Sequence, residues 1–202
     1  MGVFGLTGGI GMGKTSTASM FVVEGVSILD TDQIARELTL PGGECISSIR
    51  EEFGDRYIRS DGGLDRERMA ALVFADARER KKLEGILHPQ IRSVWQERVA
   101  AVRRQETESL IVVIPLLFET GVADEFDSVV CVACDAAAQT QRLRSRGWSD
   151  GQINARIKAQ LPIEEKIGRS DIVLWTSCAM EVSRRQVVKI AGEMRNGADP
   201  SS

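Results

Sequence analysis

The sequence predicts an α/β fold, a five-stranded parallel sheet flanked by helices, and three observations carry this prediction. First, a short apolar segment at residues 3–7 leads through a glycine-rich turn into a helical pattern and then into a second apolar segment at 26–29. This compact strand–helix–strand order produces a right-handed unit with parallel strands. Second, three more apolar segments, 110–114, 129–133 and 172–175, have the length of buried strands. Third, 202 residues that are 43% hydrophobic suffice for one such core.

The first helix follows the glycine-rich turn, and we expect it to bury one face. Ala18, Phe21 and Val22 are placed on that face by their helical spacing. Gly25 is expected to end the helix, because a glycine directly after the C-cap adopts the left-handed conformation at little cost.

About 80 residues separate the second strand from the third, far more than the dozen or so that a crossover helix needs. Turn signals at 41–43 and 61–63 divide this segment into helical stretches. The longest stretch is expected to be interrupted early by Pro89, and its apolar positions at helical spacing are Leu83, Leu87, Ile91, Val94 or Trp95, and Val102. The simplest interpretation is a helical subdomain inserted after the second strand.

The last third of the chain predicts three more helices. An arginine-rich helix spans 136–146, the next begins at Ser149 with Gln152 completing a capping box, and the last spans 180–194. The last helix is expected to bury Met180, Val187, Ala191 and Met194, and the polar segment 196–202 to fray. The expected organisation is a core at about 1–38, 108–143 and 168–195, an insertion at about 39–107, and a lid at about 144–167.

Composition and charge exclude several classes of protein. The net charge of -3 argues against a nucleic-acid partner, which would require a basic excess. The longest apolar stretch, 111–118, is too short to span a bilayer, so we expect no membrane association. Four cysteines, two of them in one apolar run, do not form a secreted disulfide framework. The pair Cys131 and Cys134 has no partner pair for a metal site. We therefore expect a cytoplasmic protein.

The segment Gly8-x4-Gly13-Lys14-Thr15 matches the phosphate loop of nucleotide-binding proteins. Glycines let backbone N–H groups wrap a polyphosphate, and the positive end of the following helix points at it. Lys14 would contact the β- and γ-phosphates, and the Thr15 hydroxyl would ligate Mg²⁺. A purely structural glycine-rich turn is the alternative, but the position between a strand and a helix favours nucleotide binding.

Two carboxylates, Asp30 and Asp32, follow the second strand at the sheet edge where ligands bind. Asp30 with Gln33 fits a capping box, which leaves Asp32 in the first helical turn. Asp32 could merely complement the helix dipole, or it could accept the proton of an attacking hydroxyl or hold Mg²⁺. The third strand ends in Pro115–Glu119 without the directly following aspartate of motor ATPases and GTPases, which favours small-molecule kinases.

Arginines follow the fourth strand on one expected helix face. Gln139, Arg142 and Arg146 are spaced by three and four residues, so the arginines could neutralise charge during phosphate transfer. A solvated basic face is the alternative. The single histidine, His88, precedes Pro89, and a lone histidine is more often a packed or capping group than a base.

Together these motifs resemble the dephospho-CoA kinase family over nearly the whole chain. The matching segments are Leu6–Thr15, Asp30–Arg36, Leu87–Pro89 with Ile91, Pro115–Glu119, Gln139 with Arg142, Leu143 and Arg146, and Arg156 with Ile157 and Gln160. Two departures stand out. Met12 replaces the usual Ser inside the loop, and the segment 170–176 lacks the Asn that usually follows the last strand.

The resemblance implies a P-loop, nucleotide-kinase-like fold and transfer of the ATP γ-phosphate to the 3′-hydroxyl of dephospho-CoA, with Mg²⁺. It implies that Asp32 is the base and Arg142 a phosphate-contacting lid arginine, and that the inserted helices receive dephospho-CoA with His88 and Arg66. The residues then expected to bind ATP are Gly9, Gly11, Met12, Gly13, Lys14, Thr15, Ser16 and Arg146.

Two other functions remain open at this point. Another small-molecule kinase would keep the loop, but it would not be expected to carry His88-Pro89 and the run 115–119. A non-enzymatic nucleotide switch would need an acid after the third strand and a group that positions water, and neither is found.

Overall fold

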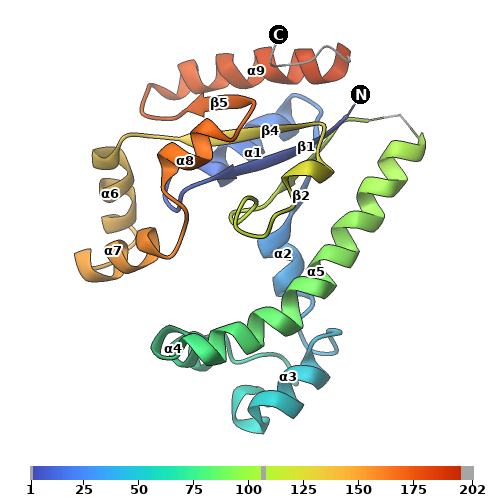
Figure 1. The fold of residues 1–202 in the computed structure, drawn as a ribbon, viewed down its shortest axis with the longest axis vertical. Helices are drawn as coiled ribbons and strands as arrows, with labels where there is room; N and C mark the ends of the chain where they lie inside the picture. The colour runs from blue at the N-terminus through green and yellow to red at the C-terminus, as the bar shows by residue number, and fades with distance from the viewer. Residues whose placement is uncertain (1, 106–107, 197–202) are drawn as a thin grey trace. The chain divides into compact units, whose positions relative to one another are not determined.

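A central sheet with strand order β2-β3-β1-β4-β5 organises the chain (Figure 1). The computed structural model describes residues 2–105 and 108–196, the last without its side chain. The pairs β1–β3, β1–β4 and β4–β5 are parallel, and β1 lies between β3 and β4. The five predicted strands are confirmed as β1 Val3–Gly8, β2 Ser27–Asp30, β3 Leu110–Val113, β4 Ser128–Ala133 and β5 Ile172–Trp175.

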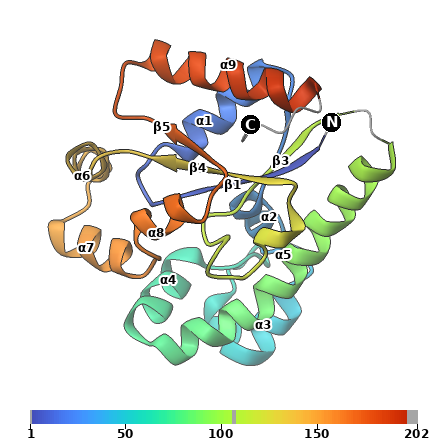
Figure 2. The ribbon, with the colours of Figure 1, turned by 45° about the horizontal axis from the view of Figure 1, so that its top comes forward.

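Two helices, α1 (Lys14–Val23) and α9 (Met180–Asn196), pack against each other and against one face of the sheet (Figure 2). Alternate strand residues point toward them, because successive side chains of a strand face opposite sides. The buried residues of this core are Phe4, Leu6, Ala18, Phe21, Val26, Ile111, Val113, Val130, Val132, Leu174, Val187, Ile190, Ala191 and Met194.

The prediction of burial is wrong for two apolar residues, Val22 and Met180. Val22 is 56% exposed, because it lies about 100° around α1 from buried Phe21. Met180 is 63% exposed at the first position of α9. Gly25 does end α1 as predicted. It has a φ of 80°, and the N–H groups of Gly25 and Val26 bond the carbonyls of Val22 and Phe21, the pattern of a Schellman cap.

The chain divides into two compact units, Met1–Leu29 with Val99–Ser202, and Asp30–Arg98. The second unit begins and ends earlier than the expected insertion at 39–107. It contains the helices α2 Thr31–Glu37, α3 Ile46–Phe53, the 3-10 helix η1 Asp55–Tyr57, α4 Arg66–Ala75 and most of α5 Ala77–Gln105. Buried apolar side chains in these elements include Ile34, Ile49, Phe53, Met69 and Trp95.

The helix α5 runs without interruption through Pro89, so the expected early break is wrong. Proline removes one N–H from the helix, but the flanking turns keep their own hydrogen bonds. Trp95 rather than Val94 is the buried member of the predicted pair: Trp95 is 3% exposed and Val94 is 37% exposed.

Three short helices and a 3-10 helix complete the first unit: α6 Ala136–Arg144, α7 Asp150–Lys158, α8 Ile163–Gly168 and η2 Ala123–Glu125. The predicted capping box at the start of α7 is present, with Ser149 and Gln152 as its two partners. Helix α8, which we expected in the lid, packs against β1 and β4 and therefore belongs to the core. The residues 197–202 of the expected frayed tail lie outside the described residues.

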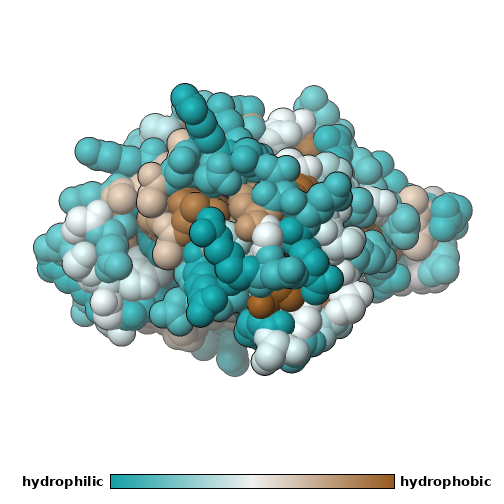
Figure 3. Space-filling view, turned by 90° about the horizontal axis from the view of Figure 1, so that it is seen from below, coloured by the Kyte–Doolittle hydropathy of each residue, from teal (hydrophilic) through white to brown (hydrophobic). Residues whose placement is uncertain are grey.

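The face shown in Figure 3 is mostly hydrophilic, with small hydrophobic areas between charged and polar side chains. Within residues 2–105 and 108–196, no helix combines the length and the apolar character that crossing a bilayer demands.

Candidate active site

The predicted phosphate loop connects β1 to α1, and its glycines are required by backbone geometry. Gly8, Gly11 and Gly13 have φ values of 139°, 76° and 97°, which side chains other than glycine rarely adopt. A Cβ on Gly8 would lie 2.2 Å from the carbonyl oxygen of Val132 in β4, and one on Gly11 would lie 2.8 Å from Leu143. The loop can therefore pack this closely against β4 and α6 only with glycine at positions 8 and 11.

Lys14 begins α1 and folds back over the loop. Its Nζ donates to the carbonyl oxygens of Gly8 and Gly9 at 2.8 and 3.0 Å. No side chain caps α1 at its N-cap Gly13, and the first turn holds no acidic residue. Thr15 and Ser16 are exposed in this turn. An uncapped helix start beside a lysine is an arrangement that suits a bound phosphate.

Thr176 follows β5, in the segment where the sequence lacks the expected asparagine, and it connects three parts of this site. Its hydroxyl donates to the carbonyl oxygen of Met12 at 2.8 Å, and its N–H bonds the carbonyl of Ala133. Met12 itself is 3% exposed, so its side chain packs inward and only its backbone faces this network.

Arg142 reaches the end of the phosphate loop from α6. Its guanidinium donates to Oγ1 and the carbonyl oxygen of Thr176 at 2.9 and 2.6 Å. A Cβ built on Gly13 would lie 3.6 Å from one guanidinium nitrogen. The structure thus brings Arg142 and the phosphate loop together.

Arg146 does not share this helix face. Helix α6 ends at Arg144, and Arg146 lies exposed in the following turn, just before Gly147 with its φ of 82°. The expected helix to residue 146 is therefore too long, because the turn at Gly147 begins earlier than the periodicity suggests. Gln139 does lie on the face of Arg142 and is buried.

The two carboxylates at the end of β2, Asp30 and Asp32, lie in different environments. Asp30 is the N-cap of α2 and accepts the N–H of Asp32 at 2.9 Å. The predicted reciprocal bond of the capping box is wrong, since the Gln33 side chain donates to Glu37 instead. Asp32 lies exposed in the first turn of α2. Both carboxylates belong to the unit that begins at Asp30.

Arg66 lies in a basic cluster of the second unit. It donates to the Arg36 carbonyl at 2.9 Å and to the Thr39 hydroxyl at 2.6 Å. Burial lowers the pKa of Arg66, and the neighbouring charges of Arg36 and Arg59 lower it further. Like charges gathered in this way favour an anionic ligand that would relieve their repulsion. His88 is exposed on α5, so it is not the packed group that a lone histidine usually is.

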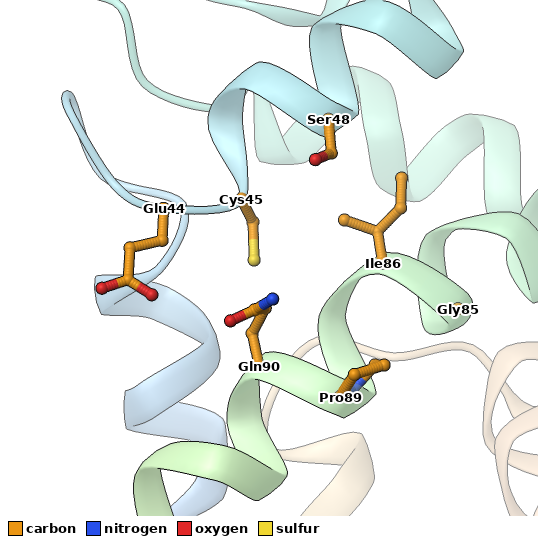
Figure 4. A pocket seen from close by; sticks show the side chains of 7 residues that line it. All are labelled: Glu44, Cys45, Ser48, Gly85, Ile86, Pro89 and Gln90. Carbon is orange, nitrogen blue, oxygen red and sulfur yellow. The ribbon is translucent and has the colours of Figure 1, made fainter.

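A pocket of about 280 Å³ lies within the same unit, between the start of α3 and the middle of α5 (Figure 4). The side chains of Cys45 and Gln90 point toward each other across it. Its lining residues are Glu44, Cys45, Ser48, Gly85, Ile86, Pro89 and Gln90. Burial raises the pKa of the Cys45 thiol, and Glu44 adds to this shift.

A buried ion pair lies beside the sheet that the sequence does not predict. Lys166 of α8 is fully buried, and its Nζ donates to Glu119 at 2.8 Å and to the Pro115 carbonyl at 2.8 Å. Glu119 is the last residue of the run singled out in the sequence, but Lys166 carries no signal because lysine is normally exposed. Burial raises the pKa of nearby Cys131 to about 11, although Lys166 opposes this shift.

The sheet and the phosphate loop define the class of protein: the chain has the fold of kinases that are built on a phosphate loop. Shikimate kinase from Acinetobacter baumannii has a similar fold, with a TM-score of 0.51 and 15% identity over 98% of this chain and 94% of that chain.

A family model described as dephospho-CoA kinase matches residues 2–181. Curated dephospho-CoA kinases from Nitrosospira multiformis and Bdellovibrio bacteriovorus are 42% and 39% identical, each over 92% of both chains. A crystal structure from Thermus thermophilus superposes with a TM-score of 0.77 at 31% identity, over 95% of this chain and 96% of that chain. Dephospho-CoA kinase from Campylobacter jejuni superposes with a TM-score of 0.73 at 23% identity, over 96% and 98%. The chain belongs to the dephospho-CoA kinase family.

Proposed function

We propose that this protein transfers the γ-phosphate of ATP to the 3′-hydroxyl of dephospho-CoA, giving coenzyme A and ADP. The observation that carries the proposal is the family match over residues 2–181, joined to a phosphate loop whose lysine lies over its backbone. The family supplies the acceptor, and the loop supplies the means of holding a triphosphate.

The donor end of the reaction uses the loop. The N–H groups at the start of α1 bind phosphate oxygens, and Lys14 exchanges its carbonyl partners for the β- and γ-phosphates as charge develops there. The Thr15 hydroxyl is exposed in the first turn and is the hard oxygen ligand that Mg²⁺ prefers. Mg²⁺ bound there would neutralise phosphate charge.

Asp32 acts as the general base on the acceptor hydroxyl. Asp30 already caps α2, so the helix does not depend on Asp32 for its start. Asp32 is exposed at the end of a strand whose carboxyl edge carries ligands in this class of fold. A carboxylate that accepts the hydroxyl proton makes the oxygen a better nucleophile toward the γ-phosphate.

Arginines hold the phosphates at both ends of the reaction. Arg142, bound to Thr176 beside Gly13, and Arg146 in the following turn contact the nucleotide phosphates. Arg66, repelled by Arg36, binds the diphosphate of dephospho-CoA, whose charge relieves that repulsion. His88 lies next to Pro89 on α5 and contributes to the same substrate.

The second unit receives the long arm of dephospho-CoA. Its pocket combines apolar Ile86 and Pro89 with polar Ser48 and Gln90, which suits an arm that carries both methyl and amide groups. The segment between α6 and α8 closes as a lid over the nucleotide and excludes water. We place this reaction in the cytoplasm, since all four cysteines are free thiols, which persist in reducing compartments.

The test is a coupled ADP-release assay with ATP and a panel of hydroxyl acceptors. Dephospho-CoA should exceed adenosine in kcat/KM by at least about a hundredfold, roughly 2.7 kcal/mol, because binding energy from its arm aligns the hydroxyl. Phosphorus NMR should place the new phosphate on the 3′-oxygen. Comparable rates with adenosine or AMP, or phosphate on another oxygen, would assign the protein to another kinase class. ATP binding without any transfer would favour a nucleotide switch.

A further inference from the structure

Both backbone groups of one loop residue, Ile10, are bound by glutamine side chains from distant segments. The N–H of Ile10 donates to Oε1 of Gln160 at 2.9 Å, and its carbonyl oxygen accepts Nε2 of Gln139 at 2.8 Å. Ile10 lies in the middle of the phosphate loop, between glycines that favour no single backbone conformation. The hydrogen bonds to its N–H and to its carbonyl oxygen therefore fix the backbone orientation of Ile10, which the neighbouring glycines do not fix.

Gln139 is itself held firmly. It lies buried in α6, one turn before Arg142, and Asp135 caps that helix. Arg142 bonds Thr176, which in turn donates to the Met12 carbonyl. Helix α6 therefore holds the loop at two points, at Ile10 directly and at Met12 through Thr176.

Gln160 is held from the other side. It lies just beyond α7, and the N–H of the next residue, Leu161, donates to Glu119 at 2.9 Å. The same carboxylate pairs with buried Lys166, which also bonds the Pro115 carbonyl. The backbone at Gln160 is thus fixed to the segment that follows β3, and its side chain reaches the loop from a rigid base.

We propose that Gln139 and Gln160 are positioning residues for the phosphate loop. They hold Ile10 by opposite ends, so the loop has the shape that a triphosphate requires before nucleotide binds, and they act without contacting the nucleotide. A neutral amide suits this task, because a carboxylate beside the loop would repel phosphate and a cation would compete with Lys14. The inference rests on the proposed function only in taking ATP as the donor.

The first experiment measures Mg·ATP affinity by calorimetry, without acceptor, for Gln139→Ala, Gln160→Ala and the double variant. Each single change should weaken ATP binding at least about fivefold, which converts to roughly 1 kcal/mol. The double variant should lose less than the product of the single losses, since either change already releases Ile10. Exposed Gln141 of α6 gives the matched control, and Gln141→Ala should bind ATP as the wild type does.

Steady-state kinetics separate positioning from a general structural role. The KM for ATP should rise in both single variants, while the KM for dephospho-CoA stays within about twofold. Gln139 is buried, so Gln139→Ala could fail to fold; half-buried Gln160 then decides through Gln160→Ala alone.

A second experiment follows amide hydrogen exchange at Ile10 in the nucleotide-free protein. Gln160→Ala should speed exchange of this N–H, because its acceptor is gone. Gln160→Glu keeps an acceptor oxygen and should restore protection, whereas Gln139→Glu removes the donor to the Ile10 carbonyl and should not protect the loop. Both variants add one negative charge near Ile10, so the added charge is matched between them.

ATP affinity within twofold of wild type in Gln160→Ala, or unchanged exchange at Ile10, would overturn the inference. An equal loss in Gln141→Ala, or fully multiplicative losses in the double variant, would do the same. A wild type that binds ATP but leaves dephospho-CoA unphosphorylated would refute the proposed function alone, because calorimetry needs no acceptor.

Discussion

Lys14 concentrates positive charge at the phosphate loop, where its ammonium lies against the Gly8 and Gly9 carbonyls. Lys14→Ala should lower kcat by at least about a thousandfold, because the cation stabilises charge that develops on the transferring phosphate. The melting temperature should change little, since glycine geometry and the contacts to α6 and β4 shape the loop.

Exposed Lys158 offers the control for this change, and Lys158→Ala should keep full activity. Turnover of Lys14→Ala within tenfold of wild type would contradict the assignment of the loop.

Asp30 caps α2, and we propose Asp32 as the general base, so substitutions at these two positions should affect stability and catalysis separately. Asp30→Ala removes the cap of α2 and should cost about 1 kcal/mol of stability while leaving measurable activity. Asp32→Asn keeps the cap and should preserve the melting temperature while kcat collapses. Thermal melts and initial rates on both variants check this division. Equal losses of stability and of rate in the two variants would argue against it.

At the level of elements, the sequence predicts the strands well and the helix faces less well. Each strand is a short apolar run in a buried sheet, so composition alone identifies it. Val22 and Met180 were expected on the buried helix faces, but Val22 lies beside buried Phe21 rather than one turn from it, and Met180 is the first residue of α9. Pro89 was expected to break α5, yet one missing N–H is tolerated inside a helix of 29 residues.

The start of α6 gives a pH-dependent prediction. Asp135 accepts the N–H of Ala138 at 2.7 Å, and this bond, aided by Ser177, lowers the pKa of Asp135. The folded chain therefore binds this proton less readily than the unfolded chain. At pH values above the ordinary aspartate pKa, the charged Asp135 cap makes its full contribution to the stability of the folded chain. This contribution is lost as pH falls through the lowered pKa of Asp135.

The melting temperature of Asp135→Ala should lie below that of wild type by a constant gap from pH 7 to pH 5, and the gap should narrow progressively as pH falls below about 4. Exposed Asp124 is the comparison, because Asp124→Ala removes a carboxylate of the same type that makes no such cap. A gap for Asp135→Ala that persists unchanged to pH 2 would show that the carboxylate charge is irrelevant.

At the level of the whole molecule, lid closure is the motion to test. The segment between α6 and α8, which we propose as the lid, contains Gly147 and Trp148, and the Arg156 guanidinium lies 4.2 Å from the centre of the Trp148 ring. Fluorescence, and hydrogen exchange over residues 142–160, should change when an ATP analogue and dephospho-CoA bind together.

Trp148→Phe should abolish the fluorescence change and keep the exchange change, which assigns the signal to the lid. If neither fluorescence nor hydrogen exchange changes at saturating ligand concentrations, the prediction of lid closure is contradicted.

The site as a whole was predictable only where its residues are neighbours in sequence. The loop, its lysine and the two acids at the end of β2 form local motifs whose chemistry can be recognised directly. Thr176 and Lys166 act through contacts with residues 164 and 51 positions away, so no local pattern marks them. Gln160 does lie in a matching motif, but its contact with Ile10, 150 positions away, does not follow from that motif. Lys166 even reverses the usual rule, because its charge is buried and paired.

The close approach of Gly8 to the Val132 carbonyl has a consequence for mutational scanning. A mutational scan scored by activity alone would group Gly8 with Lys14 and Asp32, since we expect substitutions at all three positions to abolish activity. The cause would differ, because a side chain at Gly8 would force β1 away from β4 and reduce the amount of folded protein in the cell. Scoring abundance beside activity would separate the residue that the sheet needs from the residues that the reaction needs.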